Sequence, residues 1–191
     1  MRFLIIIFSV CFLTACQLTQ QPETVKTVDM YNRDGDMVGT AKLSEDPKGV
    51  KIELKLEGLT PGFHGTHVHE IGECEAPDFK SAGNHLNPEK KKHGLLHPEG
   101  PHLGDLPNIE VDTSGKVDTE LTVSDATLLK GKNSLTERGG TSLVITAEAD
   151  DGMSQISGNS GERIICGEIK DKKGETDDQE PTDPTEKEKK K

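Results

Sequence analysis

The chain has 191 residues, enough for one domain with a substantial core, and neither an internal repeat nor a second apolar region indicates two domains. Aromatic residues make up 3% of the chain and Trp is absent, so the core must consist mainly of Leu, Ile, Val and Ala. The net charge of -11 argues against nucleic acid as a partner, because a phosphate-binding surface needs clustered Lys and Arg. An anionic substrate would need a local positive group to overcome this charge.

The first 15 residues have the pattern of a secretory signal peptide. An arginine precedes an apolar run from Phe3 to Leu13, which is too short to cross a bilayer as a permanent helix. The residues Leu13-Thr14-Ala15-Cys16 resemble the lipobox of bacterial lipoproteins, in which the cysteine becomes the lipid-modified first residue. We therefore expect an exported lipoprotein, anchored through Cys16 to the extracytoplasmic face of a cell membrane. The alternative is an ordinary cleaved signal with an incidental cysteine.

Both ends of the mature chain are expected to lie outside the fold. Residues 16–24 are polar and suited to a flexible tether. Residues 171–191 contain no apolar side chain and predict a disordered, charged tail, either solvated without a role or resting on anionic lipid through its terminal lysines. The folded domain is thus predicted at residues 25–170.

The domain between these ends shows the two-residue period of β-strands. In residues 49–59, apolar side chains at Val50, Ile52, Leu54 and Leu56 alternate with charged ones, which describes a strand with one buried face. Further strands are predicted at residues 25–31, 37–43, 109–113, 117–123, 142–147 and 163–169. Asp-Gly at 34–35 and Ser-Gly at 114–115 are typical hairpin turns. Without a helical pattern of useful length, the fold class is all-β, a sandwich or flattened barrel.

Two histidines, His67 and His69, bracket Val68 in a predicted strand. Side chains two residues apart on a strand point to the same face, so the two rings would lie side by side with Val68 packing behind them. Such a pair suits a metal ion that prefers imidazole, which includes zinc, copper, iron and nickel. By itself the motif is as often incidental as functional.

A long segment, residues 70–107, interrupts the strand pattern and is rich in Gly, Pro and Lys. Long loops in compact domains are usually functional or disordered. All seven histidines of the chain lie between residues 64 and 102, which favours a metal site over chance. Within the loop, three imidazoles and a carboxylate could complete a tetrahedral zinc site with no position open to water, a structural site that would order the loop. These residues are His85, His93, His102 and Asp105.

The four cysteines divide into two groups. Cys11 would leave with the signal peptide, and Cys16 would carry the lipid. Cys74 and Cys166 remain, an even pair in an exported and therefore oxidising setting. We expect them to form a disulfide.

Six motifs together resemble the copper/zinc superoxide dismutases. They are GFHGTHVHE (62–70), SAGNHLNP (81–88), KHG (92–94), HLGDLPN (102–108), LVITAEADD (143–151) and GNSGERIICGEI (158–169). They occur in the order in which the family has them and cover roughly residues 25–170. The resemblance implies a Greek-key β-sandwich or flattened barrel with long metal-binding loops, and an enzyme that dismutates superoxide to oxygen and hydrogen peroxide.

The resemblance also implies two metal ions that share one ligand. Copper would be bound by His67, His69 and His85. Zinc would be bound by His85, His93, His102 and Asp105. His85 resembles the imidazolate that bridges copper to zinc and carries a proton during turnover.

Further roles follow from the matching positions. Arg163 resembles the arginine beside the copper that guides and holds the anion, which is the local positive charge that the acidic chain needs. Asp150 resembles the carboxylate that joins a copper ligand to a zinc ligand, since ligating imidazoles need their other nitrogen fixed. Cys74 and Cys166 resemble the intrasubunit disulfide of the family.

Three positions match no ligand. His64 resembles a histidine that bonds to the backbone, and His97 is expected to be an exposed loop residue. The family places its fourth copper histidine where this chain has Thr146. A threonine hydroxyl is a poor copper ligand, so we expect weaker copper binding and reduced turnover, with the zinc site unaffected.

Two functions therefore remain open. The first is a lipid-anchored superoxide dismutase that works with three copper imidazoles or recruits His97 or water as a fourth ligand. The second is a zinc-stabilised family member without catalysis, a surface or metal-binding protein. Arg163, Asp150, His67 and His69 favour the first function, whereas Thr146 favours the second.

Overall fold

The computed structural model describes residues 25–171 of the chain. The signal peptide expected at 1–15, the tether at 16–24 and all of the charged tail beyond its first residue lie outside the described residues, so these boundaries stay predictions. Among residues 25–171, no helix has the length and apolar character needed to span a bilayer.

The described part of the chain is almost entirely strand and loop, which confirms the all-β class. Its elements are β1 (Val25–Asn32), β2 (Met37–Asp46), β3 (Gly49–Glu57), β4 (Gly62–His64), β5 (Thr66–His69), the short 3-10 turn η1 (Lys80–Ala82), β6 (Ile109–Val111), β7 (Lys116–Ser124), β8 (Thr141–Thr146) and β9 (Arg163–Ile169). Every predicted strand is present with ends shifted by at most a few residues, while β4 was not predicted.

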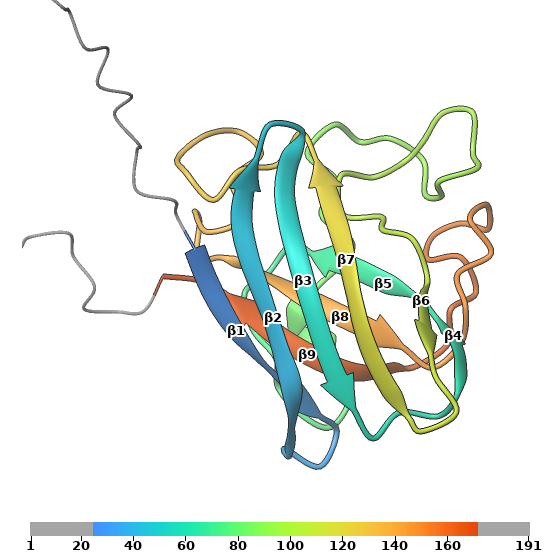
Figure 1. Ribbon diagram of the computed structural model, residues 1–191. Coiled ribbons are helices and arrows are strands. Elements are labelled where there is room, and N and C mark those ends of the chain that lie inside the picture. Colours follow the sequence, from blue (N-terminus) through green and yellow to red (C-terminus); the bar gives the residue numbers. More distant parts are fainter. Residues whose placement is uncertain (1–24, 172–191) are drawn as a thin grey trace, which may run out of the picture.

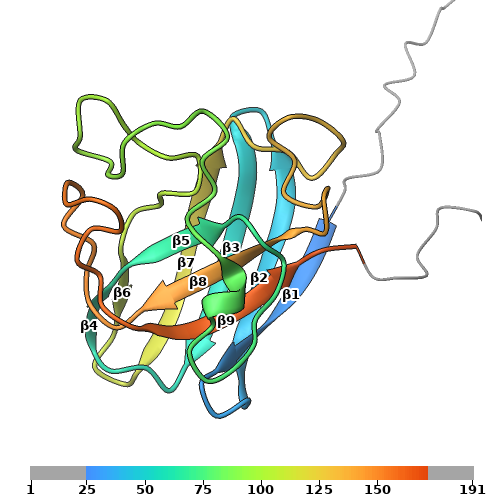
Figure 2. The ribbon, with the colours of Figure 1, turned by 180° about the vertical axis from the view of Figure 1, so that it is seen from behind.

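The strands form a strongly curved antiparallel sheet. Seven of them pair in the order β5-β8-β9-β1-β2-β3-β7, and β4 pairs with β6 in a separate two-stranded sheet. Because β4 leads directly into β5 and β6 leads through a turn into β7, the small sheet lies between the two edges of the large one (Figure 1). The result is a flattened barrel, in which β5, β8 and β9 cross behind β2, β3 and β7 in Figure 1 and in front of them in Figure 2.

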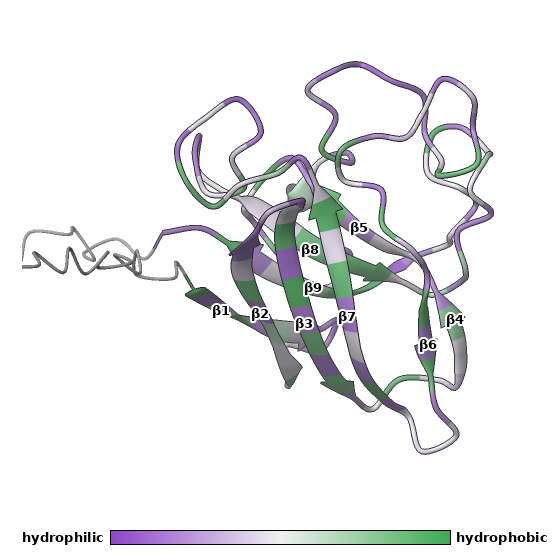
Figure 3. Ribbon diagram, turned by 45° about the horizontal axis from the view of Figure 1, so that its top comes forward, coloured by the Kyte–Doolittle hydropathy of each residue, from purple (hydrophilic) through white to green (hydrophobic). Residues whose placement is uncertain are grey.

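β3 shows why the sequence folds in this way. Val50, Ile52, Leu54 and Leu56 are at most 1% exposed, whereas the charged residues between them point outward. Burying each such aliphatic side chain contributes about 1.5–3 kcal/mol relative to leaving it exposed. The same alternation along β2 and β7 gives the banded colouring of Figure 3, and the apolar faces meet in one core.

Both predicted turns are present, but only Asp34-Gly35 closes a hairpin of paired strands, because the strands on either side of Ser114-Gly115 lie in different sheets. Gly35 and Gly115 have φ values of +86° and +79°, in the left-handed region that favours glycine. In the second turn, Asp112 Oδ1 accepts hydrogen bonds from the backbone N–H groups of Ser114 and Lys116. The first turn joins the paired strands β1 and β2, and the second leads the chain from β6 in the small sheet to β7 in the large one.

The free edge of β5 is covered by the long loop between β5 and β6. Val68 N donates to Gly104 O and Leu86 N donates to Val68 O, both at 2.8 Å, so two parts of the loop bond to the same residue of β5. Gly104 is needed there, because a Cβ atom on it would lie 2.1 Å from Val68 O. Covering the edge in this way satisfies its backbone groups and fixes the loop against the strand that carries His67 and His69.

Candidate metal centre

The loop between β5 and β6 packs against β5 and brings two predicted ligands of the loop beside two of the strand. His67 forms a bridge with Asp105, and His69 forms a bridge with His85, on the edge of β5 that the loop covers. All of Thr66–His69 is buried, and Val68, at 0% exposure, packs into the main core as predicted. The strand thus carries its histidine rings on the face opposite to the core.

The first cluster consists of His67, His69 and His85. Each can place one ring nitrogen within 4.8 Å of the others, and all three side chains are buried. The rings of His67 and His85 are stacked with centroids 4.0 Å apart, while His69 meets His85 edge-on at 5.0 Å. These are the three residues for which the resemblance implied copper.

The second cluster is centred on the carboxylate of Asp105. Its Oδ1 lies 2.9 Å from Nδ1 of His85, 3.1 Å from Nδ1 of His93 and 3.3 Å from Nδ1 of His102. Its Oδ2 accepts hydrogen bonds from the backbone N–H groups of His102 and Gly94. Three imidazoles and one carboxylate facing a common point are the donor set of a closed zinc site.

The donor atoms of both clusters fit metal ions. Nδ1 of His67, Nε2 of His69 and Nδ1 of His102 are buried without a hydrogen-bond partner. An unpartnered buried polar atom costs about 1–3 kcal/mol, and ligation of a metal would remove that cost. The other ring nitrogens of His67 and His69 are used, since His69 Nδ1 donates to Gly83 O at 3.0 Å and His67 Nε2 bonds to Asp150.

Asp150 joins the two clusters as the resemblance implied. Its Oδ2 lies 2.6 Å from Nε2 of His67 and 3.0 Å from Nε2 of His93. Asp150 is itself fixed by Asn108, whose amide accepts from Asp150 N at 2.8 Å and donates to Asp150 O at 2.9 Å. Asn108 ends the HLGDLPN motif, but it was not among the residues predicted to have a role.

Burial and neighbouring charges set the protonation of the clusters. Burial lowers the pKa of His85 to about 4 and, together with the charges of His85 and Arg163, lowers the pKa of His69 well below its ordinary value. Burial also acts to lower the pKa of His93, but hydrogen bonds to Asp105 and Asp150 outweigh it and raise the pKa to about 9. Burial alone would raise the pKa of Asp105, yet the surrounding rings hold it far below its usual range.

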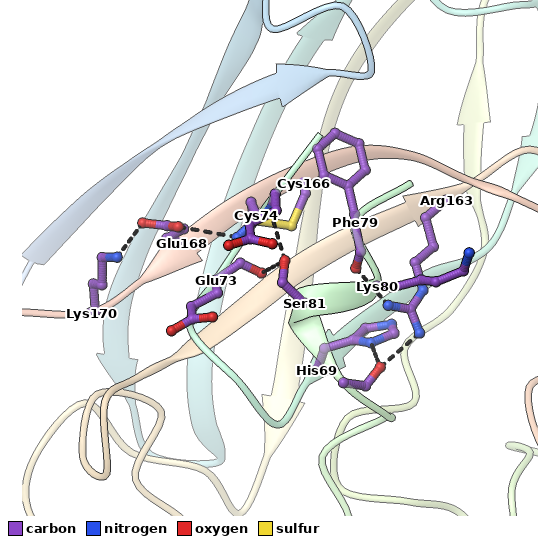
Figure 4. Close-up of a disulfide and its surroundings, with 12 residues drawn as sticks. His69, Glu73, Cys74, Phe79, Lys80, Ser81, Arg163, Cys166, Glu168 and Lys170 are labelled. Carbon is purple, nitrogen blue, oxygen red and sulfur yellow. Dashed lines mark hydrogen bonds and ion pairs between the residues drawn. A yellow bond between two sulfur atoms is a disulfide. The ribbon is translucent and has the colours of Figure 1, made fainter. Parts of the chain in front are cut away.

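Arg163 is held beside the first cluster by the loop that carries the disulfide. Its guanidinium donates from Nη1 to Phe79 O at 2.6 Å and from Nη2 to Gly83 O at 2.7 Å (Figure 4). Gly83 O also accepts from His69 Nδ1, so the arginine and a predicted copper ligand share one carbonyl oxygen. Burial lowers the pKa of Arg163, but a guanidinium remains charged at neutral pH.

The predicted disulfide is present between Cys74 of this loop and Cys166 of β9. Phe79, Ala82, Val144 and Cys166 form a second, small buried cluster around it. The covalent bond and this apolar cluster attach residues 74–83 to the sheet, and they thereby place the two carbonyl oxygens that hold Arg163 (Figure 4).

Thr146 ends β8 beside the first cluster. It is 4% exposed, and its Oγ1 donates a hydrogen bond to Glu148 O at 3.3 Å. A pocket of about 570 Å³ opens onto this position. The pocket is lined by the loop between β5 and β6, by the loop between β8 and β9 and by the adjoining strand ends. Among its residues are His69, His85, Thr146, Ile156, Ser160 and Arg163.

The two remaining histidines lie apart from the donor clusters. The ring nitrogens of His64 are each 2.9 Å from a backbone carbonyl oxygen, of Thr146 and Thr60. His97 Nδ1 accepts from Glu99 N, and His97 belongs to none of the donor groups found among residues 25–171. The structure therefore offers no support for His97 as a fourth ligand beside Thr146.

Comparison with known proteins agrees with this geometry. The model of the family described as copper/zinc superoxide dismutase matches residues 37–169. A protein named superoxide dismutase [Cu-Zn] 1 from Aquifex aeolicus is 49% identical over 144 residues, which cover 74% of this chain and 85% of that protein. A protein named superoxide dismutase-like protein YojM from Bacillus subtilis is 43% identical over 145 residues, 74% of each chain.

Solved structures show the same relationship. A crystal structure of a superoxide dismutase-like protein from Bacillus subtilis superposes with a TM-score of 0.73 at 41% identity, covering 75% of this chain and 97% of the other. The copper/zinc superoxide dismutase from Brucella abortus superposes with a TM-score of 0.63 at 34% identity, covering 76% and 99%. At these identities the similarity extends to sequence as well as fold.

Proposed function

The chain belongs to the copper/zinc superoxide dismutase family, and from that premise we propose that it converts two superoxide anions and two protons to oxygen and hydrogen peroxide. The observation that carries the proposal is the pair of donor clusters that share His85 and are joined by Asp150. A protein that bound zinc alone would have no physical need for the unpartnered nitrogens of His67 and His69.

We propose that zinc is held by His85, His93, His102 and Asp105 and has a structural role, because four protein donors leave no position for substrate. Copper would be held by His67, His69 and His85. When bound, copper supplies the one-electron oxidation and reduction that dismutation requires.

The remaining steps fall to side chains of the chain itself. Arg163 supplies the positive charge that attracts and orients the anion in the pocket, against a net charge of -11. His85 is the residue that we propose to carry a proton at Nε2, since its Nδ1 faces Asp105 and the zinc donors. Asp150 keeps the rings of His67 and His93 in fixed orientations.

Thr146 reduces this activity in our proposal. Its hydroxyl lies at the pocket, and a neutral hydroxyl is a poor ligand for copper in either oxidation state. The second candidate function, a zinc-stabilised protein without catalysis, draws its support from the same residue. One relative of this chain is named only as superoxide dismutase-like.

The deciding experiment compares wild type with Thr146→His and with Thr146→Val, a control that removes the hydroxyl without adding a ligand. Each protein is loaded with copper and zinc, and bound metal and superoxide decay are measured. We expect wild type to bind one zinc, to hold copper at least about tenfold more weakly than Thr146→His, and to be slower. Wild type with one tightly bound copper and the speed of Thr146→His would overturn the missing-ligand argument, while zinc alone and no activity would establish the second function.

We further propose that the protein is anchored to a membrane through lipid on Cys16, a residue outside the described range. The support is the lipobox-like sequence alone. Replacing Cys16 with Ser should move the mature protein from the membrane fraction to the soluble extracytoplasmic fraction. A protein that is equally soluble with and without Cys16 would point to ordinary signal cleavage.

A further inference from the structure

Gln155 lies in the loop between β8 and β9 and bonds to the main chain of a proposed zinc ligand. Its Oε1 accepts from His93 N at 3.0 Å, and its Nε2 donates to His93 O at 3.0 Å. A third bond runs from Nε2 to Met153 O at 2.9 Å. The side-chain amide thus pairs with both polar groups of one residue in a loop 62 positions away.

These bonds restrain the main chain of His93, whose ring is already held by two carboxylates. The His93 side chain is 0% exposed, with Nδ1 directed to Asp105 and Nε2 to Asp150. Asp150 fixes the ring and Gln155 fixes the main chain, and both come from the loop between β8 and β9. The ring is therefore unable to tilt or slide without breaking contacts to that loop.

The two loops also meet closely at Gly152, three residues before Gln155. Leu96 N donates to Gly152 O at 3.1 Å. A Cβ atom on Gly94 would lie 2.1 Å from the same oxygen, so only glycine permits this approach. Residues 93–96 and 152–155 consequently form one continuous contact between the zinc-binding loop and the loop that bears Asp150.

The residues that follow Gln155 form a wall of the pocket. Ile156, Ser157 and Ser160 line it together with Thr146 and Arg163. A displacement of Gln155 would therefore be felt in two places, at the main chain of His93 and at the pocket wall that substrate must pass.

We propose that Gln155 is a positioning residue of the metal centre, which sets the main chain of His93 for zinc and makes zinc binding and the order of residues 147–162 depend on each other. The inference rests on the proposed role of His93 as a zinc ligand. By thermodynamic linkage, zinc should stabilise the loop by the same factor by which the intact loop strengthens zinc binding. Residues that orient a ligand in this way typically change metal affinity 10–100-fold when they are replaced.

The test uses two substitutions at this position and one control in the same loop. Gln155→Met keeps the length of the side chain and removes all three bonds. Gln155→Glu keeps the acceptor for His93 N but loses the donor, and it directs a carboxylate at two carbonyl oxygens. The control is Asn159→Gly, which removes amide bonds to Asp151 and Ser154 but leaves His93 untouched; glycine suits its φ of +51°.

Three quantities are measured on the full chain: the rate of zinc loss to a chelator, the visible spectrum of cobalt placed in the zinc site, and hydrogen exchange of residues 147–162 with and without zinc. We expect both Gln155 variants to lose zinc at least about tenfold faster, to alter the cobalt spectrum and to lose the protection that zinc gives the loop. Asn159→Gly should leave zinc loss and the cobalt spectrum unchanged.

Zinc loss and a cobalt spectrum like those of wild type in Gln155→Met would overturn the inference. Equal effects of Asn159→Gly and Gln155→Met would also overturn it, because they would trace the change to general loosening of the loop. If wild type bound no zinc, the proposed function would fail instead, so the two failures are distinguishable.

Discussion

β3 and the loop segment 84–106 both contain fully buried side chains, but different forces hold them. The inward side chains of β3 are all aliphatic and at most 1% exposed. The buried residues of the segment include His85, His93 and Asp105, whose polar atoms face one another across the loop. The strand needs only the removal of apolar surface from water, whereas the segment needs each polar atom to find its partner.

Stability and function are therefore carried by different parts of this fold. The apolar core of the sheet contains none of the proposed metal ligands, so we expect the sheet to form without metal. The polar cluster is stable only when charges and ring nitrogens are matched, which makes it sensitive to metal, pH and single substitutions. The predictions below test this separation, beginning with the largest expected effect.

Removal of the disulfide between Cys74 and Cys166, which attaches the long loop to the sheet, should have the largest effect on stability. For a sequence separation of 92 residues, the chain-entropy model gives a loss of about 4–5 kcal/mol in the free energy of unfolding. Denaturant titration of the double variant Cys74→Ser/Cys166→Ala measures it, with reduced wild type as the control. An unchanged midpoint would mean that the loop is held to the sheet without the covalent bond.

Replacement of Asp105 by Asn should damage the segment and spare the sheet. The neutral amide loses the charge around which three rings gather, so zinc affinity should fall about 100-fold or more. Hydrogen exchange should rise in residues 84–106 and stay slow in β3. Asp112→Asn, the same chemical change in an exposed turn, is the control. Equal loss of protection in β3 and the segment would show that the two regions form one cooperative unit.

Zinc binding should depend on pH through His93. Its pKa is raised to about 9, so below that pH the zinc-free protein carries a proton on the ring that zinc must displace. Apparent zinc affinity should therefore fall about tenfold per pH unit from pH 9 to pH 7, with about one proton released per zinc. Chelator competition and calorimetry in buffers of different ionisation enthalpy measure both. A flat affinity over this range would contradict the raised pKa.

A small change in the core of the sheet should have a small effect on stability and none on metal binding. Ile52→Val removes one buried methylene from β3 and should lower the free energy of unfolding by about 1 kcal/mol, with zinc affinity unchanged. Leu96→Ala truncates a loop side chain that is 72% exposed, so it should change the free energy of unfolding by less than about 0.5 kcal/mol. A change in zinc affinity on Ile52→Val would show that the core transmits strain to the loops.

Much of the fold could be predicted because the pattern is local. β3 and β9 lie where their apolar periodicity indicated. β4 was missed because it has only three residues, Gly62, Phe63 and His64, of which just one is buried, so no alternation marks it. The 3-10 turn at Lys80–Ala82 was missed for the same reason.

The residues that could donate to metal were predictable from the sequence, but the residues that hold them in position were not. The count and position of the histidines, together with the family motifs, indicated both clusters, and the structure brings those residues together. Asn108 and Gln155 were not identified as supports, because a single amide side chain carries no periodic or compositional signal. The carbonyl oxygen of Gly83, shared by Arg163 and His69, has no side-chain signature at all.

Side-chain chemistry and short-range spacing were enough to predict which strand residues face water, which residues carry atoms that can bind metal and which cysteines remain to pair. The tertiary structure alone decided which ring nitrogen meets which carboxylate and which amide restrains which ligand. Those contacts join residues tens of positions apart, such as Gln155 and His93, and they depend on how two loops pack against β5 and against each other.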